Sequence, residues 1–555
     1  MTSLLTPLPR TAVAHERDGL ALVALECLFP DATSVPQFWQ NVLDRRCSIR
    51  LCGERHLPEH LRTRVESRLS ALMPTLDVRP QQFRLPPSIT RNFDPRVMQM
   101  LEVVRRTLDA CPTVRRERLL TVLCTQKMMP REQASTSYER RLKIMALFDE
   151  IKALGGLDAD LAESIRGQFS ELYDRDFPNP GFEGFLAESS SLMTSIIPKT
   201  FDLGGGHISI DATCASVFCA LQIAWNAIHS GQNDAALVVA MSPEAMPARF
   251  VHYAQLGIFT RDAVLPFDEG ATGSALGEGI GVFLVKRLAD AEASGDPIHA
   301  VVRGVGFSSD GVGSGFVAPK REGQVRAMGA AYRMAEIDPL QVRMVEAHAT
   351  GAPKGDITEL ESMREVFGTR ADSPERVVIG SVKGNVGHML EASGMASLFK
   401  VCSALCEGIL PPTLFRTLRP ELRDSQSRFQ LLEEPQPWPE QDHRRFAAAS
   451  SFGFGGVNAH VVLEAHPSTA KGLPGRQRTV ATFSSPTSVP APEAPVTSDL
   501  LMNAPPEDSR PAPAITDWVM LSDTEVEQGV LEIVAGCTGY EVGELQLDHD
   551  LDADL

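Results

Sequence analysis

The sequence predicts an α/β domain made of two similar halves. One segment, 209–228, runs from a short β-branched stretch through Cys214 into an apolar run of helical length. A second segment, 377–405, repeats this order with a strand-like stretch, a glycine-rich turn, His388 and a mostly apolar run. Apolar runs of this length are typical of helices buried in a large core. The repetition therefore predicts a duplicated α/β fold whose active site lies where the two buried helices begin.

Length and composition are those of a globular protein with a large core. The 555 residues are 43% hydrophobic, and the ten cysteines show no paired framework, which suits a reducing compartment. The first twenty residues lack the apolar core of a secretory signal. No uncharged apolar run is long enough to span a bilayer. We therefore expect a soluble, cytoplasmic protein without a membrane partner.

The negative charge is concentrated at the C-terminal end. Residues 501–555 hold thirteen acidic residues against the single basic Arg510, a net charge of −12. The whole chain carries −18, which leaves only −6 for the other 500 residues. Neither part has the basic excess of a nucleic-acid-binding surface, so we expect no nucleic-acid partner.

Changes in composition divide the chain into four parts. Residues 1–17 look like a flexible lead-in, and 18–465 form the compact α/β region, which opens with a buried strand at 20–28. Residues 466–515 are rich in Pro, Ala and Ser, which predicts a linker that cannot build a core. Residues 516–555 combine amphipathic helical spacing with an acidic end, which predicts part of a small helical domain.

A charged, helix-prone stretch interrupts the α/β region between about 130 and 185. Its charges are incompatible with the core of a sheet domain. We expect this stretch to be a surface cap or an excursion on the side of a dimer interface.

Cys214 is the strongest candidate for a nucleophile. It lies at the first turn of the helix predicted at 217–228, where unpaired N–H groups and the positive end of the helix dipole favour a thiolate. A thiolate there could attack a carbonyl or thioester carbon. The alternative is a small buried hydrophobic residue, the commoner role for a free cysteine.

Two further segments supply groups for the same chemistry. A strand ending near residue 346 delivers His348 into a turn at 349–353, and a helix starts near Asp356. A glycine-rich turn at 450–458 leads into a strand, and its glycines allow a backbone N–H to point at a developing oxyanion. Taken singly, a histidine at the end of a strand or a glycine-rich turn is more often structural.

Together, four motifs resemble the β-ketoacyl synthase family, in particular the ketosynthase domains of type I polyketide and polyunsaturated-fatty-acid synthases. The motifs are Asp-Ala-Thr-Cys-Ala-Ser (211–216), Val-Glu-Ala-His-Ala-Thr-Gly-Ala-Pro-Lys-Gly-Asp (345–356), Gly-Ser-Val-Lys-Gly-Asn-Val-Gly-His (380–388) and Ser-Phe-Gly-Phe-Gly-Gly-Val-Asn-Ala-His (451–460). Their order and spacing are specific, and the resemblance covers about 18–465. It implies a thiolase-like layered αβαβα fold with two pseudo-duplicated halves, normally a homodimer.

The resemblance also implies a role for each of seven residues. The nucleophile is Cys214, and the catalytic histidines are His348 and His388. The supporting lysine is Lys383, with Glu359 as its carboxylate partner. The N–H groups of Cys214 and Phe454 form the oxyanion hole, Phe454 also gates the site, and Thr350 contacts the pantetheine arm. The family commonly reads His-Gly-Thr-Gly-Thr where this chain has Ala349 and Ala352. One hydroxyl, that of Thr350, remains, so the pantetheine contact is weaker or differently made.

The implied activity is a decarboxylative Claisen condensation between a Cys-bound acyl chain and a malonyl-type extender on an acyl carrier protein. The synthase domain itself would need no cofactor and no metal. The phosphopantetheine would be carried by the acyl carrier domains that act as its partners.

The C-terminal segment resembles the first half of an acyl carrier domain of the polyunsaturated-fatty-acid-synthase type. That pattern would continue into Gly-x-Asp-Ser, whose serine carries phosphopantetheine and lies beyond Leu555. We therefore expect a piece of a longer synthase, with the extender loaded by an acyltransferase elsewhere in the polypeptide or acting in trans. The alternative is an acidic tail without a fold of its own.

Four other interpretations are weaker. A thiolase would carry a second catalytic cysteine in the glycine-rich loop, where this chain has Phe454. A non-condensing acyl-relay protein or a chain-length-factor-like partner subunit would lack the cysteine or one histidine. The glycines at 304 and 306 lack the third glycine and the following helix of a dinucleotide site. Cys402 and Cys406 lie in an apolar helix, which favours core packing over metal binding.

Overall fold

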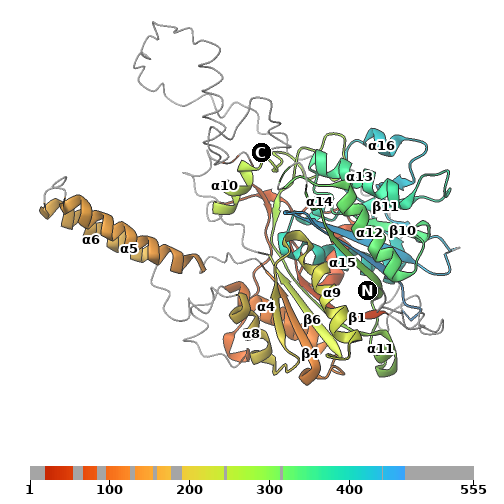
Figure 1. Ribbon diagram of the computed structural model, residues 1–555, viewed down its shortest axis with the longest axis horizontal. Helices are drawn as coiled ribbons and strands as arrows, with labels where there is room; N and C mark the ends of the chain where they lie inside the picture. The colour runs from red at the N-terminus through yellow and green to blue at the C-terminus, as the bar shows by residue number, and fades with distance from the viewer. Residues whose placement is uncertain are drawn as a thin grey trace, which may run out of the picture. The chain divides into compact units, whose positions relative to one another are not determined.

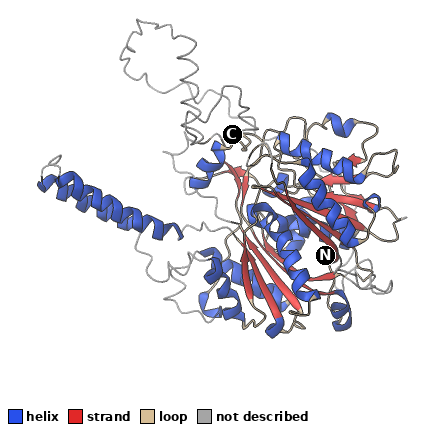
Figure 2. Cartoon of the chain, viewed as in Figure 1, coloured by secondary structure: helices blue, strands red, loops and turns tan. Residues whose placement is uncertain are grey.

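A large mixed sheet is the centre of the computed structural model (Figures 1 and 2). The structure describes residues 19–468, except for 54–64, 66, 84–94, 126–131, 154–158, 177–189, 243–246, 313–314, 316 and 441. The predicted lead-in at 1–17, nearly all of the predicted linker and the predicted carrier segment at 516–555 lie outside the described residues.

The sheet has eleven strands, drawn in two sets from the two halves of the α/β region. The first set is β1 (Leu20–Leu28), β4 (Leu119–Cys124), β5 (His207–Ile210), β6 (Ala235–Met241) and β8 (Ile280–Arg287). The second set is β9 (Ala300–Ser309), β10 (Val342–Glu346), β11 (Val377–Gly380), β15 (Phe446–Gly453) and β16 (Val457–Glu464), with β13 (Phe429–Gln430) added at its edge.

Both sets have the same topology. The spatial order is β5-β4-β6-β8-β1 in the first and β11-β10-β15-β16-β9 in the second, so the chain-order pattern is third, second, fourth, fifth, first in each. The parallel and antiparallel pairings also match: β4 is parallel to β5 and β6 as β10 is to β11 and β15. The two sets join through the antiparallel pair β1 and β9. The predicted duplication is confirmed.

Helices cover the two halves of the sheet in three layers. Between the halves lie α9 (Ser216–His229) and α15 (Ser393–Glu407), whose side chains share one core cluster with strands of both halves. Beyond the first half lie α4 (Pro95–Asp109) and α8 (Ser190–Phe201). Beyond the second half lie α12 (Arg321–Ala335) and α13 (Pro353–Phe367) (Figure 1). This is the expected layered, thiolase-like fold.

Shorter elements complete the described chain. The helices are α1 (Val35–Leu43), α10 (Pro247–Gln255), α11 (Leu288–Ser294), α14 (Lys383–Val386) and α16 (Pro420–Arg423). The 3-10 turns are η2 (Pro80–Phe83), η3 (Arg116–Arg118), η4 (Thr213–Ala215), η5 (Pro339–Gln341) and η6 (Leu390–Ala392). Two small sheets are formed by β2 (Arg50–Leu51), β3 (Leu69–Ala71) and β7 (Leu276–Gly277), and by β12 (Ile409–Leu410) and β14 (Gln436–Pro437).

The expected boundaries hold for some elements and shift in others. The first strand spans 20–28 as predicted, and the helix predicted at 217–228 is α9 with one more residue at each end. The second buried helix starts at Ser393 rather than 389, because the intervening residues form η6. The predicted glycine-rich turn at 450–458 narrows to 454–456, because β15 and β16 extend into it from both sides.

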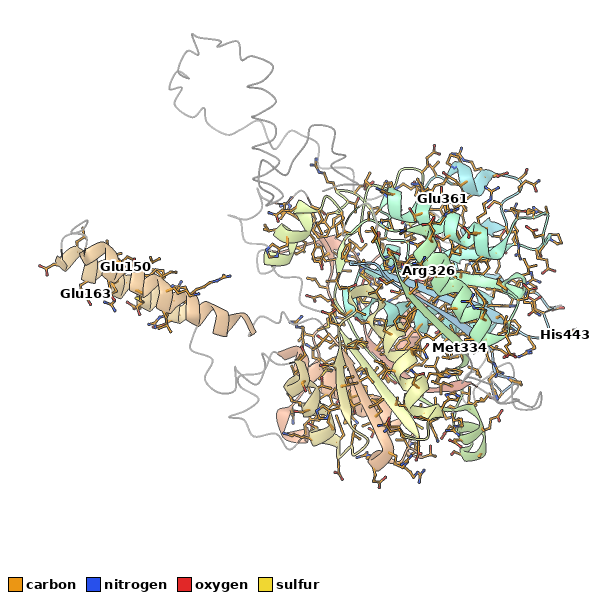
Figure 3. The ribbon with its side chains drawn as sticks, viewed as in Figure 1. Glu150, Glu163, Arg326, Met334, Glu361 and His443 are labelled. Atoms are coloured by element: carbon orange, nitrogen blue, oxygen red, sulfur yellow. The ribbon has the colours of Figure 1, made fainter. Side chains whose placement is uncertain are left out.

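The helix-prone excursion is an antiparallel pair of helices, α5 (Glu132–Ala153) and α6 (Ala159–Asp176) (Figures 1 and 3). Phe148 and Phe169 pack between them, with ring centroids 5.8 Å apart. Glu150 and Glu163, labelled in Figure 3, are exposed. The helical part of the prediction is confirmed. Across the whole described chain, no helix combines the length and the apolar character that a bilayer span requires.

A buried ion pair ties the central layer to the second half of the sheet. Lys400 Nζ of α15 lies 2.6 Å from Glu346 Oε2 at the end of β10, and the two side chains are 1% and 0% exposed. Glu346 Oε1 accepts the N–H of Val382, just after β11, at 2.7 Å. Removal of one partner would leave the other charge buried without compensation. The pair therefore fixes the ends of the two strands that lead to His348 and Lys383.

We predict that Lys400→Met lowers the free energy of unfolding by about 3–5 kcal/mol, because it leaves the buried Glu346 carboxylate without its ion-pair partner. The double variant Lys400→Met/Glu346→Gln should recover most of this loss, because the amide is neutral and still accepts the Val382 N–H. Chemical denaturation measures both. An equal loss in the single and the double variant would contradict the prediction.

Candidate active site

The site forms where four loops follow strands of both halves of the sheet. Cys214 follows β5 in η4, His348 follows β10, His388 follows β11 and α14, and Phe454 lies in the turn between β15 and β16. Ligands of open α/β sheets commonly bind at the carboxyl ends of the strands. The duplication brings the two loop sets together, because α9 and α15 start side by side in the central layer.

Cys214 and the two histidines lie within reach of one small reacting group. The Sγ atom of Cys214 is 3.2 Å from His388 Nε2. The rings of His348 and His388 are nearly perpendicular, with centroids 5.8 Å apart. Cys214 is 2% exposed and His388 7% exposed, whereas His348 is partly exposed. One thioester carbonyl could therefore touch all three side chains.

Backbone N–H groups set the tautomer of both imidazoles. His388 Nδ1 accepts the N–H of Leu390 at 3.0 Å, and His348 Nδ1 accepts the N–H of Phe452 at 3.2 Å. A backbone N–H can only donate, so we assign the ring hydrogen of each neutral imidazole to Nε2. Each histidine therefore presents an N–H donor, and that of His388 points at the Cys214 sulfur.

Both imidazoles are neutral at physiological pH. Burial lowers the pKa of His388 to about 3, and the positive charge of Lys383 acts in the same direction. Burial likewise holds the pKa of His348 well below its usual range, with further lowering by Lys383 and His388. From the sequence alone, the only reason to expect a neutral imidazole is the nearby helix N-terminus, whose dipole disfavours an imidazolium. In the structure, burial is the largest cause.

The Cys214 sulfur is a thiol in the resting enzyme. Burial, the largest cause, and the Glu391 carboxylate together raise the pKa of Cys214 to about 12. Lys383 and hydrogen bonds from the N–H groups of Cys214 and Phe454 act in the opposite direction. The expected thiolate is therefore wrong for the resting state, because desolvation of the sulfur outweighs the helix N-terminus. The same two N–H groups are those expected to form an oxyanion hole.

The turn that carries the nucleophile is strained. Thr213 has φ of +50°, a region that residues with a side chain rarely occupy. Asp211 Oδ1 accepts the Thr213 N–H at 2.9 Å, and Ser216 Oγ bonds both Ala212 N–H and Thr213 C=O. The corresponding first residue of η6, Leu390, has φ of +48°. The duplicated fold thus places the same unusual turn in front of each central helix.

Lys383 and Glu359 both bind the His348 loop, and their charges interact there without a direct contact. Lys383 Nζ donates to the carbonyl of His348 at 2.5 Å. The two Glu359 oxygens accept the N–H groups of His348 and Ala349, each at 2.8 Å. The ion pairs found in the described chain do not include a direct contact between Lys383 and Glu359, so Glu359 acts on Lys383 through its charge. The charge of Glu359 stabilises the Lys383 cation, second to that of Glu346.

Thr350 lies in a turn held by a carboxylate that the sequence analysis did not identify. Asp356 accepts the N–H groups of Phe267, Thr350 and Gly351 at 2.8, 3.1 and 3.2 Å. Asp356 precedes Glu359 by one turn of α13. This i,i+3 spacing places both carboxylates on one face of the helix and could have identified Asp356 from the sequence. The Thr350 hydroxyl accepts the N–H of Ala352 at 3.4 Å, which leaves its hydrogen free to meet a ligand.

Two other residues at the site were missed from sequence. The Tyr253 ring of α10 stacks on Phe454, with centroids 6.3 Å apart and planes at 30°. Ser451 Oγ donates to the carbonyl of Cys214 at 2.6 Å. Tyr253 and Phe454 are far apart in the chain, and no local pattern connects them.

We predict that alkylation of Cys214 by iodoacetamide accelerates about tenfold per pH unit from pH 7 to pH 10, without reaching a plateau. A pKa of about 12 means that the thiolate fraction keeps rising tenfold per unit over this range. Peptide mass mapping separates Cys214 from the other cysteines, and N-acetylcysteine, which levels off near its ordinary pKa, is the control. A plateau anywhere below pH 10 would contradict the raised pKa.

Comparisons with known proteins agree with this geometry. The model for the β-ketoacyl synthase N-terminal domain matches residues 18–116 and 160–291. The model for the β-ketoacyl synthase C-terminal domain matches 299–416, and that for the ketoacyl-synthetase C-terminal extension matches 420–489. All of α5 falls in the gap of the first match, between 116 and 160.

Curated relatives are much longer proteins. The chain is 34% identical over 345 residues to polyketide synthase GfsA of Streptomyces halstedii, covering 60% of this chain and 5% of the relative. It is 34% identical to the highly reducing polyketide synthase ausV of Aspergillus calidoustus, covering 61% and 14%. It is 28% identical to one subunit of the polyunsaturated fatty acid synthase of a Thraustochytrium species, covering 80% and 16%. The chain thus spans at most about a sixth of these relatives' length.

Solved structures share the fold. The ketosynthase from module 6 of the bacillaene synthase of Bacillus subtilis matches with a TM-score of 0.67 at 26% identity, over 81% of this chain and 72% of that one. The PfaC ketosynthase–chain length factor protein matches with a TM-score of 0.67 at 25% identity, over 81% and 48%. With the two halves of the family model matched in order around Cys214, His348 and His388, the chain belongs to the β-ketoacyl synthase family.

Proposed function

We propose that the domain catalyses the decarboxylative Claisen condensation of an acyl chain, bound to Cys214, with a malonyl-type extender on an acyl carrier protein. The observation that carries the proposal is the cluster of one thiol and two neutral imidazoles, each imidazole with an Nε2–H donor, within reach of one reacting group. The product is a β-ketoacyl thioester on the carrier.

The first step transfers the acyl chain to the enzyme. The Cys214 sulfur attacks the thioester carbon of the acyl-carrier, and the carrier sulfur leaves with the thiol proton. The N–H groups of Cys214 and Phe454, which already hydrogen-bond the sulfur, are placed to stabilise the oxyanion of the tetrahedral intermediate. Because the resting sulfur is a thiol, its proton must leave during this step.

The second step forms the carbon–carbon bond. Loss of CO2 from the malonyl group leaves an enolate, whose oxygen accepts the Nε2–H groups of His348 and His388. These donors do not titrate at working pH because both pKa values are lowered by burial. The enolate carbon attacks the acyl-Cys214 carbonyl, and Cys214 leaves as thiolate and is reprotonated. Preorganised donors of this kind stabilise charge only as it develops.

The substrates in this proposal are thioesters on the phosphopantetheine arm of acyl carrier domains, and no cofactor resides in the synthase domain. The free hydrogen of the Thr350 hydroxyl is suited to a carbonyl of that arm. The extender would be loaded by an acyltransferase elsewhere or in trans. A non-condensing acyl-relay or chain-length-factor-like role is not favoured, because Cys214, His348 and His388 lie together in catalytic geometry.

We also propose that the domain is a homodimer that pairs through β5. Among the described strands, β5 pairs only with β4 and forms an edge of the sheet. Gly206 and Ile210 accept hydrogen bonds from the β4 side. Strand residues alternate in direction, so His207 and Ser209 present their N–H and C=O groups to the free edge. Ile208 is 42% exposed beside them. An open edge of this kind is a template for pairing with a second copy.

The condensation can be tested by intact-mass analysis with acyl-carrier and malonyl-carrier donors. We predict a stable acyl adduct on the wild type and on His388→Ala, and no adduct on Cys214→Ala. Condensation product should form only with the wild type, because His388→Ala loses an enolate donor, at a cost of about a hundredfold or more in rate. Acylation of the wild type without any condensation would contradict the proposal and favour the acyl-relay role.

The dimer can be tested with a matched pair of variants at the free edge. Ser209→Pro removes an N–H group that faces away from β4, so we predict that it yields monomers. Ser209→Ala keeps that N–H group and should remain dimeric. Sedimentation velocity measures both, and two dimeric variants would contradict pairing through β5.

A further inference from the structure

We propose that Ser451 is a positioning residue that holds the Cys214 turn in register with the end of β15. The proposal rests on the condensing function proposed above and adds a residue to its machinery. Ser451 Oγ donates to the carbonyl oxygen of Cys214 at 2.6 Å, across 237 residues of sequence. Ser451 and Cys214 are each 2% exposed, so water does not replace this bond.

The residues after Ser451 contact the rest of the site. The Phe452 N–H donates to His348 Nδ1 at 3.2 Å, and the Phe454 N–H acts on the Cys214 sulfur and lowers its pKa. The end of β15 and the turn after it therefore contact the backbone of the nucleophile, set the tautomer of one histidine and supply half of the expected oxyanion hole. Among these residues, Ser451 is the one whose side chain hydrogen-bonds the backbone of Cys214.

The strained turn that carries Cys214 must be stabilised by contacts with the surrounding structure. Thr213 is strained at φ of +50°, and strained backbone persists only where its surroundings determine it. The strand end lies directly against this turn, since a Cβ at Gly453 would be 2.1 Å from Thr213 Oγ1 and 2.8 Å from Ala212 O. Such close packing fixes the distance between the two segments. The Ser451 hydroxyl fixes their relative orientation, because it bonds one defined carbonyl.

The neighbouring Ser450 provides a matched control. It is also fully buried, and its hydroxyl is 2.9 Å from Nδ1 of His460. Adjacent strand residues point to opposite faces, so this hydroxyl lies away from the Cys214 turn. Loss of either hydroxyl removes one buried hydrogen bond and destabilises the fold. Only loss of the Ser451 hydroxyl should change the chemistry of Cys214.

The expected defect follows from what the hydrogen bond between Ser451 and the Cys214 carbonyl holds in place. Without the hydroxyl, the Cys214 turn is free to rotate relative to the strand end, and the Phe454 N–H moves away from the sulfur and from the developing oxyanion. The Phe454 N–H lowers the pKa of Cys214, so its loss shifts thiol reactivity to higher pH. Acyl transfer should slow through kcat, with little effect on KM, because the contacts are made to reacting atoms.

The experiment compares Ser451→Val with Ser451→Thr, which have the same shape and differ in the hydroxyl. Iodoacetamide alkylation of Cys214 is followed against pH, and acyl transfer from an acyl-carrier is followed by intact mass. We expect Val to slow both reactions about tenfold relative to Thr and to shift the alkylation profile to higher pH. Ser450→Ala should lose stability without this shift.

Equal alkylation profiles and acylation rates in the Thr and Val variants would overturn the proposal. Alkylation needs no carrier substrate, so this outcome is independent of whether the wild type condenses. A wild type that is alkylated and acylated normally but does not condense would instead overturn the proposed function. Should both β-branched variants fail to fold, Ser451→Ala against Ser450→Ala decides the question with the same readouts, and equal profiles in that pair would overturn the proposal.

Discussion

The close approach of α9 and α15 is the constraint on which the site depends. At their crossing a Cβ on Gly394 would lie 2.7 Å from the Cβ of Val217, a distance that real side chains do not adopt. Glycine at this position lets the two helix starts meet, and the turns in front of them then place Cys214 3.2 Å from His388. The two sets of strands, which have the same spatial order, supply the matching helices, and the contact between the helices brings the reactive residues together.

The same burial that packs these helices sets the charge state of the site. It keeps both imidazoles neutral and the sulfur protonated, so the resting site gathers uncharged donors around a thiol. Lys383 brings a positive charge close to them, and it is anchored to the His348 carbonyl. In the reaction proposed above, negative charge appears at the reacting atoms only during the reaction, first on an oxyanion and then on an enolate, where fixed donors are most effective.

The sequence predicted the reactive residues better than the residues that position them. Cys214 and the two histidines stand in motifs whose spacing follows from local structure, and the buried helices are evident from their apolar runs. The thiolate expectation failed because a sequence shows a helix N-terminus but not the desolvation that opposes it. The partnership of Lys383 and Glu359 acts through charge, while the hydrogen bonds of both groups go to the backbone of the His348 loop, a detail that the sequence does not show. Ser451 and Tyr253 were missed because their contacts join distant segments, which local patterns do not report.

The matching turns in front of the two central helices have an evolutionary consequence. Thr213-Cys214-Ala215-Ser216 and Leu390-Glu391-Ala392-Ser393 share a positive φ at their first residue and a serine at the start of a helix. Glu391 therefore occupies in one repeat the place that the nucleophile occupies in the other, and it is buried there. A symmetric ancestor could have carried equivalent groups at both places. Divergence at this position leaves the two repeats with different chemistry at equivalent turns, a thiol in one and a carboxylate in the other.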